Sequence, residues 1–269
     1  MSSELNPDNI LLSTSSLHIG YSQKKEVISV AEAINFEIKA GELVALIGIN
    51  GSGKSTLLKT LSGQIPALAG SVKIDNHLLS ELDLKGLGSF MSLVLTNEHV
   101  SKQLTVMELV ALGRHPYTNW LGHLSQKDVE KVHQALIQVD LLQKKDKLCQ
   151  SLSDGQFQKV LIARALAQDT ALILMDEPTT HLDMFHKAYV LKLLKSIVKN
   201  SQKSILYASH EINLALQLCD RIILIDKQQV ICGSPSELIH KGAFNGLFPK
   251  DFIVFDEHSR TFKMKISGD

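Results

Sequence analysis

The stretch LVALIGINGSGKSTLL, residues 43–58, decides the fold of this chain. Its first five residues are apolar without alternation, which is typical of a strand buried on both faces of a parallel sheet. Residues 48–56 then satisfy the pattern GxxxxGK[ST] in its required place, between a strand and a helix. The stretch therefore predicts an α/β protein with a phosphate-binding loop at the end of this strand.

The glycines of this loop indicate how phosphate is bound. Gly48, Gly51 and Gly53 let the backbone curl so that successive N–H groups face one point. The helix that is predicted to begin near Lys54 and to stop at Gly63 adds the positive end of its dipole at the same point. Together they form a cradle for phosphate oxygens.

Side chains that follow the cradle favour a nucleotide triphosphate with Mg²⁺. Lys54 is expected to reach the β- and γ-phosphates, Ser55 to ligate Mg²⁺, and Thr56 to bond near the α-phosphate. A glycine-rich turn that merely starts a helix rarely carries this lysine and hydroxyl. The loop residues expected to contact the nucleotide are Gly48, Asn50, Gly51, Ser52, Gly53, Lys54, Ser55 and Thr56.

A second apolar run, residues 172–175, ends abruptly in Asp176, Glu177 and Pro178. A carboxylate at a strand tip faces the crevice where an α/β sheet binds its ligands. We expect Asp176 to hold the Mg²⁺ shell and Glu177 to act as the general base for the attacking water. The alternative for this run alone is a pair of solvated loop acids.

Outward from these motifs, the pattern divides the chain into three kinds of segment. Buried parallel strands are predicted at residues 43–47, 171–175, 205–208 and 222–225. Alternation up to Ile38 and again at residues 71–74 predicts an antiparallel sheet at one edge. Residues 97–168 read as an inserted helical subdomain. Its amphipathic segment carries Val129, Val132, Leu136 and Val139 on one face, and Ser125 and Asp128 form a capping box.

Composition excludes several functions. Lys plus Arg and Asp plus Glu both total 28, so no net field attracts nucleic acid or anionic lipid. The apolar runs are strand-sized, far below the roughly 20 residues that span a bilayer.

The N-terminus lacks a secretion signal, and we expect a cytoplasmic protein. Cys149, Cys219 and Cys232 lack metal-ligand spacing and are expected to be apolar fillers.

The motifs together resemble those of the ABC ATPases. The resemblance rests on GINGSGKST (48–56), LSDGQ (152–156), LILMDEP (172–178), HLD (181–183) and the histidine of YASHE, in the family's order and spacing. It implies a single nucleotide-binding domain over residues 1–269: a P-loop NTPase core, an antiparallel edge subdomain, the helical insertion at about 97–168 and a C-terminal extension from about 240.

Further roles follow from this resemblance. Two chains are expected to pack head to tail, so that the phosphate loop of one and the LSDGQ segment of the other enclose each ATP. In LSDGQ, Ser153, Gly155 and Gln156 would serve the partner's nucleotide, with Ser153 at a helix start. His210 resembles the switch histidine that senses the γ-phosphate, and Asp183 the acid of the interface loop. Tyr21 resembles the aromatic on which adenine stacks, although a Tyr ending an edge strand is also an ordinary packing residue.

The insertion also indicates a subgroup. LTVMELVALGRHPYTNWLG, residues 104–122, resembles the ATPases of importers for iron siderophores, haem and cobalamin. The implied partners are a second copy, a membrane permease whose cytoplasmic helix enters a groove, and indirectly a substrate-binding protein. Tyr117 and Trp120 are candidate anchors there or ordinary packing residues. The implied location is the cytoplasmic face of the inner membrane.

Two departures from the family pattern stand out. Asp154 replaces the first glycine of LSGGQ, but at the first helical position its charge suits the helix dipole and its side chain can point sideways. The loop that normally carries a Gln after an apolar strand reads Thr96, Asn97, Glu98. We expect the Asn97 amide to take the Gln's place near Mg²⁺, with Thr96 as the main rival.

Two other classes remain as alternatives. A soluble ABC ATPase, for example in iron–sulfur cluster assembly, would have no permease, and copurification discriminates between the two. A P-loop kinase would need a lid and an acceptor site, and LSDGQ argues against it.

Overall fold

The computed structural model describes residues 9–23, 26–95, 100–118, 122–249 and 251–265. Its strands are β1 (Ile10–Gln23), β2 (Glu26–Lys39), β3 (Leu43–Ile47), β4 (Ala69–Ile74), β5 (His77–Leu78), β6 (Met91–Val94), β7 (Leu172–Asp176), β8 (Ser204–Ser209), β9 (Arg221–Asp226), β10 (Gln229–Gly233), β11 (Ile253–Asp256) and β12 (Thr261–Met264). Its helices are α1 (Lys54–Leu61), α2 (Leu84–Phe90), α3 (Val106–Ala111), α4 (Gln126–Gln138), α5 (Asp154–Ala167), α6 (Met184–Ser201), α7 (Ile212–Leu218) and α8 (Pro235–His240). Short 3-10 turns include η2 (Leu112–Tyr117).

The central sheet has the strand order β10-β9-β3-β8-β7-β6. The four predicted buried runs are confirmed as β3, β7, β8 and β9, which pair in parallel. β6 extends the parallel set beside β7, and β10 closes the other edge by pairing antiparallel with β9. The carboxyl ends of β3, β7 and β8 therefore meet at one edge of the sheet, where ligands bind in open α/β folds.

Two hydrophobic cores lie on the two faces of this sheet. Leu43, Ala45 and Ile47 of β3 pack toward the core shared with helices α3 to α7, whereas Val44 and Leu46 pack toward the core that α1 shares with the antiparallel strands. Because successive side chains of a strand point to opposite faces, one uniformly apolar run supplies both cores. The absence of alternation in the sequence is thereby explained.

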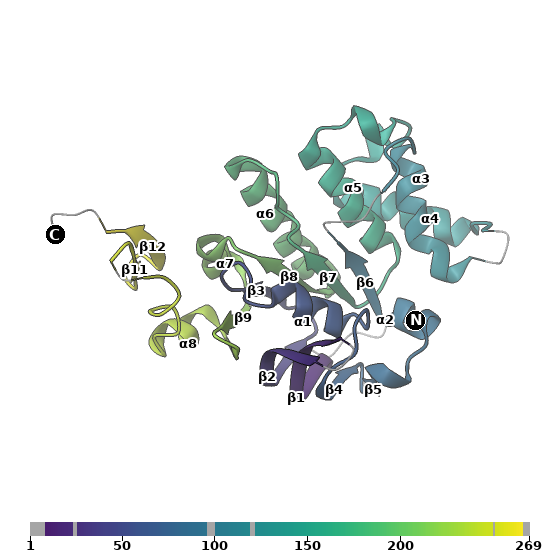
Figure 1. Ribbon diagram of the computed structural model, residues 1–269. Coiled ribbons are helices and arrows are strands. Elements are labelled where there is room, and N and C mark those ends of the chain that lie inside the picture. The colour runs from purple at the N-terminus through teal and green to yellow at the C-terminus, as the bar shows by residue number, and fades with distance from the viewer. Residues whose placement is uncertain (1–8, 24–25, 96–99, 119–121, 250, 266–269) are drawn as a thin grey trace.

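The predicted antiparallel sheet is confirmed as a separate four-stranded sheet with the order β2-β1-β4-β5. It lies on the α1 side of the central sheet (Figure 1). β1 pairs with β2 on one side and with β4 on the other. Tyr21 lies near the end of β1 and pairs there with Ile28 of β2, beyond His18, the last described β1 residue that pairs with β4.

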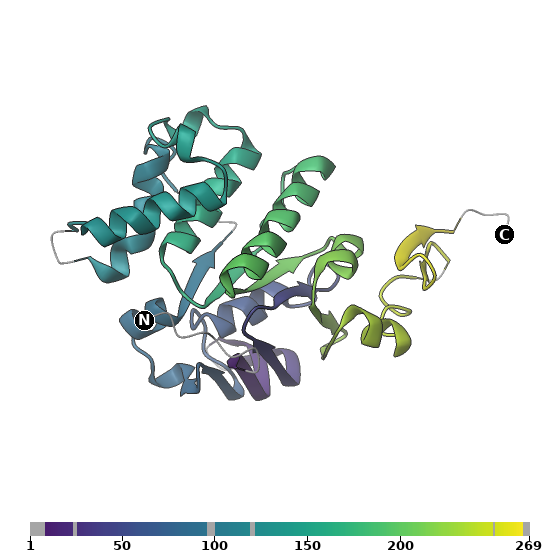
Figure 2. The ribbon, with the colours of Figure 1, turned by 180° about the vertical axis from the view of Figure 1, so that it is seen from behind.

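Helices α3, α4 and α5 form a helical lobe at one side of the molecule, and its core is continuous with that of the central sheet (Figures 1 and 2). The capping box of Ser125 and Asp128 at the start of α4 is confirmed, and Thr105 with Glu108 forms another at α3. Asp128 also pairs with Arg114, whose Nε lies 2.8 Å from Oδ1 in a buried environment. Arg114 in turn donates to the carbonyl of Ala167 at the end of α5. This pair ties η2, α4 and α5 together.

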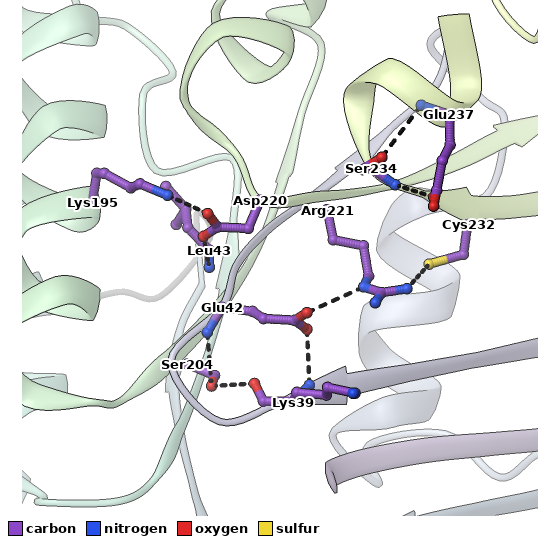
Figure 3. Close-up of polar contacts among 10 residues, drawn as sticks. All are labelled: Lys39, Glu42, Leu43, Lys195, Ser204, Asp220, Arg221, Cys232, Ser234 and Glu237. Carbon is purple, nitrogen blue, oxygen red and sulfur yellow. Dashed lines mark hydrogen bonds and ion pairs between the residues drawn. The ribbon is translucent and has the colours of Figure 1, made fainter. Parts of the chain in front are cut away.

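A polar cluster fixes the amino end of β3, which leads to the phosphate loop (Figure 3). Asp220 accepts the backbone N–H of Leu43 at 2.9 Å and pairs with Lys195 of α6. Glu42 accepts the N–H of Lys39 and faces Arg221. The cluster thus supplies acceptors for backbone N–H groups at the end of β2 and at the start of β3.

The C-terminal segment from α8 onward lies on the opposite side of the molecule from the helical lobe (Figures 1 and 2). β11 and β12 form a hairpin whose Phe255 and Phe262 stack with Phe244 and Phe248. Asn213 of α7 accepts the N–H of Phe262. Among the described residues, every helix is too short or too polar to cross a membrane.

Candidate nucleotide-binding site

The phosphate loop follows β3 and leads directly into α1, as predicted. Gly51 and Gly53 have φ values of 79° and 107°, which favour glycine. Gly48 has another reason to lack a side chain, because a Cβ there would lie 2.6 Å from the carbonyl oxygen of Ile225. Backbone conformation and close packing thus both fix the loop's glycines. α1 ends at Leu61, and Gly63 follows with φ 72°, in agreement with the predicted stop.

Lys54 is buried, and its Nζ donates to the carbonyls of Gly48 at 3.0 Å and Ile49 at 3.2 Å. Burial lowers the pKa of this ammonium group, while Glu177 and Asp176 act in the opposite direction. The Lys54 side chain therefore lies folded over the phosphate loop. It is expected to bind the phosphate groups of the nucleotide that this loop holds. Carbonyl oxygens are weak partners for an ammonium group, so phosphate oxygens can replace them.

Ser55 and Asp176 meet across the end of the sheet, with Ser55 Oγ 3.5 Å from Asp176 Oδ1. Burial and the neighbouring Glu177 raise the pKa of Asp176. A half-buried carboxylate beside a second acid is stabilised by a bound cation. Hydroxyl and carboxylate oxygens are hard ligands of the kind that Mg²⁺ prefers, and Mg²⁺ often takes only one or two from the protein. These residues fit the expected Mg²⁺ site.

Glu177 follows β7 in the left-handed region, with φ 44°. Its N–H donates to the carbonyl of Ala208 in β8, and its Oε2 accepts the hydroxyl of Thr180 at 2.8 Å. His210 follows β8, and its Nδ1 lies 3.7 Å from Glu177 Oε1. The structure thus brings the expected base and the expected γ-phosphate sensor together. Thr180, which orients the base, was missed by the sequence analysis.

Tyr21 of β1 contacts the start of α1. Its hydroxyl is 3.0 Å from Thr56 Oγ1, and the residue is 37% exposed. Tyr21 is therefore held at the end of the phosphate loop by its hydroxyl while part of the residue stays exposed. This is compatible with the expected stacking of adenine.

The LSDGQ segment starts α5, and Ser153 is its N-cap, accepting from Gln156 N–H at 3.4 Å. Ser153, Gly155 and Gln156 line a hollow of about 190 Å³ with residues of α6. Asp154 instead lines a separate pocket of about 240 Å³ with Asp176 and Glu177 of its own chain. That the Asp154 side chain points sideways, away from the partner's nucleotide, stays a prediction.

Asp183 caps α6, accepting the N–H of His186 at 2.8 Å, and its Oδ2 lies 2.8 Å from His186 Nδ1. The His186 ring fills the space beside Gly155, where a Cβ would lie 2.8 Å from His186 Cδ2. Asp183 therefore holds the start of α6 against the LSDGQ helix. His186 was also missed, since its position three residues after Asp183 was the only signal.

Several predicted residues lie outside the described residues, namely Thr96, Asn97, Glu98 and Trp120. Tyr117 is described, and its ring stacks on the Arg114 guanidinium at 4.1 Å. The three cysteines lie in apolar or partly buried surroundings, and burial raises the pKa of each thiol. Cys149 lies in an apolar core as predicted, whereas Cys219 Sγ is 3.1 Å from the Tyr207 hydroxyl and Cys232 Sγ accepts from Arg221.

The fold and this constellation define a P-loop ATPase with a phosphate loop, two strand-tip acids and a second helix-start site. A family model described as ABC transporter matches residues 31–180. The chain belongs to this family, and it hydrolyses ATP to drive transport.

Individual relatives agree. The chain is 37% identical over 220 residues to a petrobactin import ATP-binding protein of Bacillus anthracis, covering 81% of both. It is also similar to an ABC transporter that is assigned to the metal-chelate type and was solved in an inward-facing conformation. The TM-score is 0.77, the sequence identity is 27%, and the match covers 89% of both chains. It is also similar to a dimeric ATP-binding cassette in a post-hydrolysis state with ADP and Pi: TM-score 0.71, 28% identity, 83% of this chain and 98% of that one.

Proposed function

We propose that this chain is the ATPase subunit of an importer for metal chelates of the iron-siderophore, haem or cobalamin type. It works as a head-to-tail pair around two ATP molecules and lies on the cytoplasmic face of the membrane, bound to a permease. The observation that carries its enzymatic part is the meeting of Ser55, Asp176, Glu177 and His210 beside the phosphate loop. The domain remains one unit over residues 1–269, with the helical lobe at about 97–168 and an extension from about 240.

The site residues have separate tasks in hydrolysis. The N–H groups of the loop and Lys54 hold the β- and γ-phosphates, and the Tyr21 ring supports adenine. Ser55 and Asp176 would hold Mg²⁺, which supplies neutralisation of phosphate charge. Glu177 Oε1 accepts a proton from the attacking water, while Thr180 keeps Oε2 occupied. His210 bonds the γ-phosphate.

The second half-site supports the pairing of two chains. Ser153, Gly155 and Gln156 surround a hollow at the start of α5, where N–H groups and the helix dipole favour an anion. This hollow is lined by different residues from the pocket that holds Glu177. One chain therefore carries two separate half-sites, and a second copy related head to tail completes both.

A groove beside the helical lobe supports permease binding. It has a volume of about 480 Å³ and is lined by apolar residues of α2 and η2, including Leu84, Leu87, Leu112 and Pro116, with Arg164 and Gln168 of the α5 end as polar neighbours. Leu84 is 89% exposed. An amphipathic helix of the permease fits such a groove. Tyr117, which the sequence left open as an anchor or an ordinary packing residue, is absent from its lining residues among those described.

Glu177→Gln tests the enzymatic part. Because the amide keeps the shape of the side chain and loses the base, the variant should bind ATP, hydrolyse it at least a hundredfold more slowly than the wild type and accumulate as a closed dimer. Size measurement with ATP and Mg²⁺ reports the dimer. Lys54→Ala is the contrasting variant, in which nucleotide binding itself is lost. A Glu177→Gln chain that stays monomeric with bound ATP contradicts the pairing.

The cargo class rests on residues 104–122 and on relatives that import petrobactin or belong to a metal-chelate type. Deletion of the gene should impair growth on siderophore-bound iron, haem or cobalamin. Complementation with the wild-type chain, but not with Glu177→Gln, ties the defect to hydrolysis. Normal use of all three nutrients with loss of an unrelated uptake would remove this cargo class.

A further inference from the structure

The ring of His210 lies between two glutamates. Its Nδ1 is 3.7 Å from Oε1 of Glu177, and its Nε2 is 3.5 Å from Oε1 of Glu211. Glu177 is the proposed base, so contact on that side was expected. Glu211 has no role in the proposed hydrolysis, although it is the nearest carboxylate on the other side of the sensor.

Glu211 is held at both its backbone and its side chain. Its N–H donates to the hydroxyl of Ser209 at 3.0 Å, and its carbonyl accepts from Ala215 in α7. Its carboxylate forms a short ion pair with Lys187 of α6. Both side chains are mostly buried, with 22% of Lys187 and 26% of Glu211 exposed. A pair shielded in this way is screened less by salt than a surface pair.

Lys187 lies in the first turn of α6, where a positive charge is disfavoured by the helix dipole. Its pairing with Glu211 offsets this cost. The same turn is capped by Asp183 and carries His186 against Gly155 of the LSDGQ helix. Lys187 therefore connects the two half-sites of the chain. It lies on α6, which packs against the LSDGQ helix, and it reaches Glu211, which lies beside His210.

We propose that Glu211, fixed by Lys187, is a positioning residue for His210. It holds the imidazole in line with the γ-phosphate position and ties this switch to the first turn of α6. The inference rests on the proposed role of His210 as the γ-phosphate sensor. Lys187 and Glu211 touch no substrate in this scheme, so they act only through the placement of the ring.

The test compares Lys187→Met, Lys187→Arg and Glu211→Gln in the full chain. Lys187→Met keeps the packing of the stem and removes the charge, so kcat for ATP hydrolysis should fall about tenfold, as expected for a misplaced group next to the reaction. ADP lacks the γ-phosphate, and its Kd should stay within about twofold. Lys187→Arg should restore most of kcat. Combining Lys187→Met with Glu211→Gln should cost no more than Glu211→Gln alone, because both break one pair.

Lys131→Met is the matched control. Lys131 lies on another helix, α4, and also pairs with a carboxylate, Asp169, which precedes β7 at the end opposite to Asp176. This variant should retain the kcat of the wild type. The proposal is overturned if Lys187→Met hydrolyses ATP like the wild type, if it weakens ADP and ATP equally, or if Lys187→Arg gives no rescue.

His210→Ala separates failure of this inference from failure of the proposed function. An inactive His210→Ala beside a fully active Lys187→Met means that only the positioning role is wrong. A fully active His210→Ala means that the sensor assignment itself is wrong, and the positioning role falls with it.

Discussion

Glu177 shows how a single residue is placed for chemistry. A positive φ is uncommon for a residue with a side chain, and it costs of the order of 1–3 kcal/mol. The hydrogen bonds of its N–H to Ala208 and of Thr180 to Oε2 compensate part of that cost. The result is a carboxylate with one oxygen occupied and the other turned toward His210. Backbone strain of this kind is typical of functional sites, where the orientation of a side chain must be fixed.

The residue that replaces the family's Gln remains our proposal, since residues 96–98 lie outside the described part of the chain. The Asn97 amide has an oxygen suited to Mg²⁺, the Thr96 hydroxyl is too short to reproduce an amide's reach, and Glu98 would add a third acid near Asp176 and Glu177. We expect Asn97→Ala to need more Mg²⁺ for half-maximal hydrolysis and to lose stimulation by the permease. Thr96→Ala and Glu98→Ala are the comparisons, and a defect confined to Thr96→Ala moves the role to that residue.

Sequence reasoning reached the residues that carry named motifs and missed those that support them. Lys54, Ser55, Asp176 and Glu177 could be predicted because each occupies a fixed place relative to a strand end. His186, Lys187 and Glu211 contact residues of separate elements, and a pattern within one segment does not reveal such contacts. Thr180 lies only three residues after Glu177, but no motif singles it out. The glycine at position 48 was correctly predicted, but the reason includes a neighbour from β9, Ile225.

At the scale of elements, capping and buried pairing determine how the helical lobe holds together. The box at the start of α4 was readable because Ser125 and Asp128 are close in sequence. The pair between Asp128 and Arg114 was not readable, since helix α4 must first pack beside η2. One carboxylate thus caps a helix and joins two segments. Its second function is the larger one for stability, because breaking a buried ion pair costs more than removing a cap.

Asp128→Asn should lower the free energy of unfolding by about 3 kcal/mol, the loss expected when one partner of a buried pair is removed. Urea denaturation at pH 7 measures it. Hydrogen bonds from Ser125 and Arg114 lower the pKa of Asp128 in the folded state. The stabilisation is therefore present above the unfolded-state pKa of about 4 and is lost as pH falls through the lower folded-state value.

The difference between wild type and Asp128→Asn should accordingly stay constant from pH 7 to pH 5 and shrink below about pH 4. Asp146→Asn is the control, because Asp146 is an exposed carboxylate in the same lobe. It should change the free energy of unfolding by less than about 0.5 kcal/mol. Equal effects of the two substitutions would mean that the buried pair contributes nothing specific.

At the scale of the whole molecule, the start of α5 in the helical lobe lines one pocket together with the strand-tip acids Asp176 and Glu177. β7 carries Asp176 and Glu177, and its neighbour β6 leads toward the lobe. Gln168 at the end of α5 donates to the carbonyls of Gly88 and Met91, so the lobe is bonded to the start of β6. These hydrogen bonds join the lobe to the strand that pairs with β7, whose carboxyl end holds the acids.

The apolar groove between α2 and η2 gives the last prediction. Leu84 is 89% exposed at its rim, and burial of a leucine by a permease helix is worth roughly 1.5–3 kcal/mol. Leu84→Glu replaces this gain with a desolvated charge, so we expect copurification with the permease to be lost, with at least about tenfold weaker binding, while the isolated chain still hydrolyses ATP. Ile137→Glu is the control, because Ile137 is 59% exposed on α4 and lies outside the lining of the groove. If both variants keep the permease, the groove is not its docking site; if the wild type brings down no permease at all, the soluble ATPase becomes the better account of this chain.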